Sequence, residues 1–146
     1  MVQPRADGRE AARAATIALD DAGVEPGEID YVNAHASSTP IGDVAEARAI
    51  TLALGERAGT VPVSGTKAMY GHPLGASGAI EAAICALAIR DGWAPASVNL
   101  VEPEPELAGL LPGLLREGRA GTYRRVLSTS FGFGGLNAAL VFGGVD

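Results

Sequence analysis

The chain has 146 residues, a net charge of −6 and a pI near 4.8. This acidic balance argues against nucleic acid as the main partner, and the length suits one domain built around a single core. Apolar residues make up 47% of the chain but aromatic residues only 5%, so we expect helices and sheet to pack through small side chains.

The composition also limits the setting in which the chain works. The first residues contain no apolar stretch typical of a signal peptide, and no run approaches the roughly 18 consecutive apolar residues of a membrane span. The single cysteine, Cys85, excludes an internal disulfide and a cysteine-based metal cluster. We therefore expect a cytoplasmic protein with no metal site and no membrane association.

The first predicted helix starts at Asp7, which has capping-box spacing with Glu10, and ends at Gly23. Its inward stripe is expected to contain Ala15, Ala18, Leu19 and Ala22. A short strand is predicted next, over residues 29–34.

The second predicted helix starts at Asp43, which has capping-box spacing with Glu46, and stops at Gly55. Its buried face is expected to contain Ala45, Ala49 and Leu52. A second strand is predicted over residues 61–64. This alternation of helices and strands is typical of βαβ units with a parallel sheet.

The third predicted helix runs from about Ser77 to Gly92 and is expected to turn Ile80, Ile84 and Leu87 inward. After it the pattern changes. The remaining predicted elements are a short strand at 97–101, an irregular connector with one helical turn at 102–119, and a hairpin of strands 123–130 and 137–142. The sequence therefore predicts an α/β protein.

Both histidines lie where a predicted strand ends. His35 follows the strand at 29–34, and His72 lies between Gly71 and Gly75 in the loop before the third helix. An imidazole at such a place can donate a hydrogen bond to a developing oxyanion. For one histidine alone, a structural role beside a backbone carbonyl is the commoner interpretation. Two histidines that each follow a strand in one small domain favour a catalytic role over a structural one.

Three other features bear on a site. Lys67 lies five residues before His72 and could polarise that ring or pair with Glu81, a buried pair that would fix geometry more than it would stabilise. Residues 131–135, FGFGG, form either a flexible hinge that carries a gating aromatic or a glycine-rich turn with core aromatics. Cys85 lies in an apolar helix, where a thiol behaves as a small hydrophobe, so we do not expect a nucleophile there.

The motifs, in order, resemble the C-terminal half of β-ketoacyl-[acyl-carrier-protein] synthases, the condensing enzymes of fatty acid and polyketide synthesis. The resemblance covers nearly the whole chain and rests on NAHASSTPIGD, VSGTKAMYGHPLGASGAIEAA, SVNL and STSFGFGGLNAALVF. It implies one half of a thiolase-like α-β-α-β-α layered fold with a mixed, mainly parallel sheet. Residues 1–146 are then a single ketosynthase C-terminal domain. Thiolases share GHPLGASG, but they carry NEAF where this chain has NAHA.

The resemblance implies a catalytic role for four residues. His35 and His72 look like the two histidines that stabilise the enolate and the thioester oxyanion during decarboxylation of malonyl-carrier protein. Lys67 looks like the active-site lysine of the family, with Glu81 as its partner.

The resemblance also implies substrate contacts and partners. Ser37 and Thr39 fall where hydroxyls bind the phosphopantetheine arm, and Phe133 falls on the aromatic that gates the acyl pocket. The expected partner is acyl carrier protein, which brings its own phosphopantetheine, so no resident cofactor is expected. Four arginines, 116, 119, 124 and 125, could meet an acidic carrier protein or form a solvated surface cluster.

Three departures from the family pattern matter. Ala36 and Leu136 stand where the family has a glycine and a threonine, and the nucleophilic cysteine belongs to an N-terminal half that the chain does not contain. We therefore expect the histidine- and lysine-bearing half of a split condensing enzyme, completed by a separate cysteine-bearing chain in a hetero-oligomer or dimer. The alternatives are a non-catalytic scaffold subunit and an inactive fragment.

Overall fold

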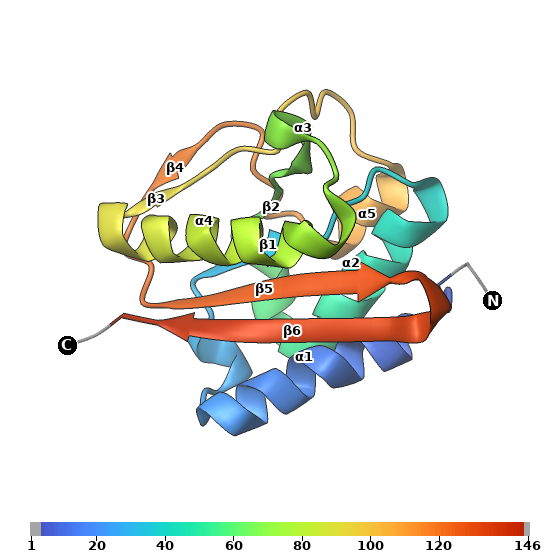
Figure 1. Cartoon of the computed structure of the whole chain (residues 1–146), viewed down its shortest axis with the longest axis horizontal. Coiled ribbons are helices and arrows are strands. Elements are labelled where there is room, and N and C mark those ends of the chain that lie inside the picture. The colour runs from blue at the N-terminus through green and yellow to red at the C-terminus, as the bar shows by residue number, and fades with distance from the viewer. Residues whose placement is uncertain (1–3, 145–146) are drawn as a thin grey trace.

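The computed structural model describes residues 4–144, and its centre is a four-stranded sheet with helices on both faces (Figure 1). The strands are β1 (Tyr31–Ala34), β2 (Val63–Gly65), β5 (Arg125–Gly132) and β6 (Leu136–Gly143). Their order is β2-β1-β5-β6, with β1 parallel to both neighbours and β6 antiparallel to β5. The predicted α/β fold with a mixed, mainly parallel sheet is confirmed.

Two helices, α1 (Arg9–Ala22) and α2 (Pro40–Leu54), cover one face of the sheet, and α4 (Ser77–Asp91) covers the other (Figure 1). Alternate residues of a strand point to opposite faces. Val32 and Leu127 therefore join the cluster under α1 and α2, whereas Tyr31 and Val126 join the cluster under α4. Strand β1 is buried on both faces, as a central parallel strand should be.

The first helix begins differently from the prediction and ends as predicted. Gly8 is its N-cap, with φ 69°, and the Asp7 carboxylate accepts the Arg9 N–H at 3.2 Å, so Asp7 and Glu10 form no capping box. A Cβ at Gly8 would lie 2.6 Å from the Ala45 carbonyl oxygen, so close packing against α2 requires glycine there. The buried residues of the helix are Ala12, Ala15 and Leu19, and Ala22 is exposed.

The second helix begins three residues earlier than predicted, at Pro40 with Thr39 as N-cap. Its buried face is centred on Glu46 and Ile50, so Ala45 and Ala49 are buried as predicted but Leu52 is 57% exposed. The prediction assigned Asp43 and Glu46 to a capping box at the helix start, whereas Glu46 lies on the buried face of the helix.

The boundaries of α4 agree with the prediction, since the helix starts at Ser77 and stops at Gly92 with φ 63°. Its orientation does not agree. Ile80 and Leu87 are 37% and 45% exposed, and a different stripe faces the sheet. That stripe consists of Ser77, Glu81, Cys85 and Ala88. The helix is apolar on nearly all sides, so its periodicity does not determine which side is buried.

The connector after α4 contains only short elements. The strand predicted at 97–101 is wrong, because Asn99 has φ 67° and turns the chain there. Strand β3 (Trp93–Ala94) pairs instead with β4 (Arg119–Ala120), and the expected helical turn is α5 (Pro105–Leu110). The remaining short helices are α3 (Lys67–Tyr70), η1 (Pro26–Glu28), η2 (Gly55–Gly59), η3 (Leu74–Ala76) and η4 (Phe133–Gly135).

The last two strands form the predicted hairpin, in which η4 provides the turn between β5 and β6. Among the helices that the structure describes, none is long and apolar enough to cross a membrane.

Candidate active site

The carboxyl ends of the parallel strands bring the two histidines together. His35 directly follows β1, and His72 lies in the loop between α3 and α4. Their ring centroids are 5.4 Å apart with an interplanar angle of 80°, an edge-to-face contact. Phe131, near the end of β5, lies 6.1 Å from the His35 ring. This edge of a parallel sheet is where α/β proteins commonly bind ligands, because strand ends and loops converge there.

A buried carboxylate holds the His35 loop. Glu46 accepts the N–H groups of His35 and Ala36, both at 2.8 Å, and the Thr129 hydroxyl at 2.7 Å. The side chain is 5% exposed. Sequence reasoning missed this contact because it assigned Glu46 to a helix cap. An acidic residue in the middle of an otherwise apolar helix was the signal available.

The His35 ring is neutral at physiological pH. Burial, with smaller contributions from the nearby Lys67 and His72 side chains, lowers its pKa to about 4. Its Nδ1 atom is buried and makes no hydrogen bond to the described residues. A neutral imidazole retains one N–H donor and adds no positive charge beside the lysine.

Lys67 and Glu81 form a buried ion pair, and their side chains are 6% and 0% exposed. The Lys67 ammonium group also donates to the His35 carbonyl oxygen, and the Tyr70 hydroxyl donates to Glu81 at 3.2 Å. The lysine therefore fixes the backbone that carries the first histidine. Of the roles proposed from the sequence, pairing with Glu81 matches the observed contact.

Two contacts at its Nδ1 atom orient the His72 ring. Its Nδ1 lies 3.0 Å from the Ser77 hydroxyl and 3.3 Å from the Leu74 amide nitrogen. A backbone N–H can only donate, so Nδ1 is an acceptor and the N–H of the ring is on Nε2. The residue is exposed. His72 thus presents an N–H donor at the surface of the site.

The predicted substrate-binding residues are partly or fully exposed. The hydroxyls of Ser37 and Thr39 are 3.4 Å apart, and neither caps α2. Phe133 is 76% exposed on the hairpin turn. The aromatic ring beside His35 belongs to Phe131, which sequence reasoning did not single out. The gating role of Phe133 stays a prediction.

Cys85 is fully buried on the side of α4 that faces the sheet, and burial raises the pKa of its thiol to about 12. At neutral pH almost none of it is thiolate, the reactive form. This agrees with the expectation that Cys85 is not a nucleophile.

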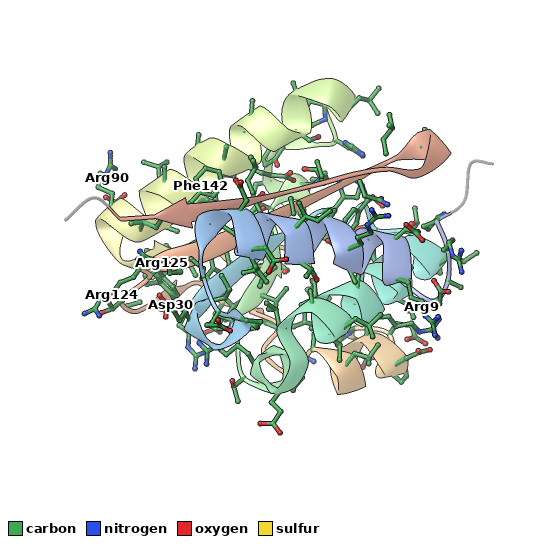
Figure 2. All side chains as sticks on the ribbon, turned by 90° about the horizontal axis from the view of Figure 1, so that it is seen from below. Arg9, Asp30, Arg90, Arg124, Arg125 and Phe142 are labelled. Atoms are coloured by element: carbon green, nitrogen blue, oxygen red, sulfur yellow. The ribbon has the colours of Figure 1, made fainter. Side chains whose placement is uncertain are left out.

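The arginines near β5 lie far from the histidines. Arg124 and Arg125 precede and begin β5, where the Asp30 carboxylate accepts their backbone N–H groups at 2.7 and 3.0 Å. Figure 2 shows them with Arg90 at one end of the molecule. Six residues of extended strand separate Arg125 from Phe131, about 20 Å. These two arginines therefore do not border the site.

The layered α/β fold and the paired histidines are those expected of a domain from a thiolase-like condensing enzyme. Residues 1–101 match the family model described as beta-ketoacyl synthase, C-terminal domain. The chain is 47% identical to the mitochondrial 3-oxoacyl-[acyl-carrier-protein] synthase of Arabidopsis thaliana, over 99% of this chain and 32% of that protein. It is 46% identical to 3-oxoacyl-[acyl-carrier-protein] synthase 2 of Mycobacterium tuberculosis, over 98% of this chain and 33% of that protein. The chain belongs to the β-ketoacyl synthase family, as its C-terminal domain.

Solved structures agree with this assignment. A β-ketoacyl synthase from Burkholderia phymatum superposes with a TM-score of 0.90 at 40% identity, over all of this chain and 34% of that one. A type II polyketide ketosynthase, in complex with its acyl-carrier protein and bound to the hexaketide, gives a TM-score of 0.92 at 34% identity, over all of this chain and 35% of that one. The chain spans about a third of the length of these relatives.

Proposed function

We propose that this chain is the histidine- and lysine-bearing half of a condensing enzyme, which joins acyl and malonyl thioesters on acyl carrier protein by decarboxylative Claisen condensation. The observation that supports this most strongly is the contact of two histidine rings, 5.4 Å apart, at the carboxyl end of a parallel sheet. Both rings offer an N–H donor, and the backbone of one is held by a buried lysine.

The chemistry requires donors of this kind. When the malonyl group loses CO₂, its C–C bond breaks and the electron pair passes to the thioester oxygen as an enolate. His35 and His72 would donate hydrogen bonds to that oxygen, and fixed donors aimed at developing charge lower the barrier. The carbanion then attacks an acyl thioester, and the C–C bond forms as a thiolate leaves.

That acyl thioester needs a nucleophilic cysteine that these 146 residues do not provide. Cys85 is the single cysteine, and its thiol is buried with a raised pKa. We propose that a separate chain supplies the cysteine and docks against apolar side chains that this half exposes. Those side chains are Leu74, Ile80, Leu87, Phe133, Leu136 and Leu140. Among similar structures are a ketosynthase with its chain length factor from the ishigamide system and a second pair from Xenorhabdus doucetiae.

The carrier protein would deliver substrate on its own phosphopantetheine arm. Ser37 and Thr39, two and four residues after His35, have hydroxyls that make no cap hydrogen bond to α2, and these would hold the polar part of the arm. The chain itself is proposed to need no resident cofactor.

A non-catalytic scaffold subunit is the second candidate, because the exposed apolar face would serve docking equally well. Co-expression with a cysteine-bearing ketosynthase half, followed by a malonyl decarboxylation assay, separates the two. We expect His35→Ala and His72→Ala each to reduce decarboxylation at least about 100-fold, and Arg124→Ala, at the far end of β5, to leave it unchanged. Normal decarboxylation by both histidine variants would contradict the proposed site. Absence of activity in every pair, with a stable complex, would favour the scaffold.

A further inference from the structure

A cavity of about 320 Å³ lies between α2, α5 and the loop at residues 97–100. Neither histidine lines it, nor does Lys67. It touches the active-site region through Ala36 and Glu46, the residues next to and beneath His35. Its walls are mostly apolar, and the larger contributors are Ile50, Val63, Leu100, Leu107, Leu111 and Leu114. A space of this size and lining suits a small organic molecule.

The titratable side chains that line this cavity are both acidic, namely Asp43 and Glu46. Glu46 is already satisfied by two backbone N–H groups and a hydroxyl. Asp43 accepts the Thr39 N–H at 3.3 Å and pairs with no cation in the described part of the chain. Burial raises the pKa of Asp43. A cation placed beside this carboxylate would offset its desolvation, whereas an anion would be repelled.

The backbone around the cavity is strained. Ala36, Ser38 and Asn99 have φ values of 38°, 60° and 67°, and all three line the cavity. Within residues 4–144, only one other non-glycine residue, Leu74, has a positive φ. Such conformations cost about 1–3 kcal/mol each and concentrate at ligand-binding sites, where the surrounding structure maintains them.

The walls of the cavity are apolar, its titratable side chains are both acidic, and three of its lining residues have positive φ values. We propose that this cavity binds a small apolar molecule that carries one primary ammonium group. The carbon skeleton lies against the leucines from α5 and the segment after it, and the ammonium group pairs with Asp43. Ala36 borders the cavity and donates its backbone N–H to Glu46. Binding of a ligand in the cavity therefore changes the environment of the neighbouring His35.

Benzylamine tests the proposal, with benzyl alcohol and benzoate as matched probes of similar size. Binding to the full chain is measured by titration of backbone amide chemical shifts. We expect benzylamine to bind with a Kd on the order of 1 mM, to shift the amides of Ala36 and Asn99, and to move the ring protons of His35. Benzyl alcohol should bind more weakly, and benzoate should not bind.

Two variants locate the binding. Val98→Trp, at a rim residue that is 40% exposed, fills the cavity without disturbing the core and should abolish benzylamine binding. Asp43→Asn keeps an oxygen for the Thr39 N–H and should weaken benzylamine about tenfold while leaving benzyl alcohol unchanged. Benzylamine binding that survives Val98→Trp, equal binding of benzoate, or no binding of any probe would overturn the proposal.

Discussion

Replacing Lys67 with methionine removes the cation from an ion pair whose side chains are 6% and 0% exposed. Breaking such a pair from one side leaves an uncompensated buried charge on Glu81, and this costs about 3–5 kcal/mol. A domain of this size has a free energy of unfolding of about 5–15 kcal/mol, so the loss is large. Urea unfolding, followed by fluorescence of the single tryptophan, Trp93, measures it.

The double variant Lys67→Met/Glu81→Leu separates burial from pairing. With both charges removed, apolar side chains of similar volume replace the pair, and most of the lost stability should return. Decarboxylation in the reconstituted enzyme should not return, because the His35 carbonyl still lacks its lysine donor. Glu106→Gln, which breaks the exposed pair with Arg48, is the matched control and should cost less than about 1 kcal/mol. If Lys67→Met also cost less than about 1 kcal/mol, the reasoning about burial would be wrong.

Three shorter predictions concern single residues. Ala36→Gly should raise the free energy of unfolding by about 1 kcal/mol, because a left-handed alanine is strained; a lower midpoint in urea would contradict this. The folded-state pKa of His35, about 4, lies below its ordinary value of 6.5, so between these two pH values the unfolded chain is protonated at His35 and the folded chain is not. Stability should therefore fall as the pH drops from 6.5 towards 4, by less than about 1.4 kcal/mol per pH unit, and His35→Gln should flatten this profile; identical slopes would refute the assignment. Cys85 should react with iodoacetamide at pH 8 only after unfolding, as mass spectrometry would show, and rapid labelling of the native chain would disprove its burial.

Local signals predicted the parts of the fold that depend on backbone conformation. Gly23 and Gly92 end α1 and α4 as expected, because a left-handed C-cap depends only on the residue at that place. The starts of α1 and α2 were predicted less accurately. Gly8 and Thr39 displaced the acidic caps expected from spacing, since packing between α1 and α2 determines how the chain enters each helix.

The candidate site shows the same division. The alternation of elements along the chain predicted that His35 and His72 both lie in loops that follow strands. It did not predict that Glu46 holds the first loop, or that Phe131 rather than Phe133 lies beside His35. These contacts join residues 11 and 96 positions apart, and spacing along a helix or strand carries no information about them.

The order of residues alone was sufficient for the fold class, the parallel core and the family, because periodicity, glycine caps and motifs are written along the chain. The buried side of α4, the cavity beside Ala36 and the mutual contact of the rings arise only when α2, α4 and the sheet pack together. Packing selects among faces of similar hydrophobicity, and that selection depends on the neighbours of each helix in space.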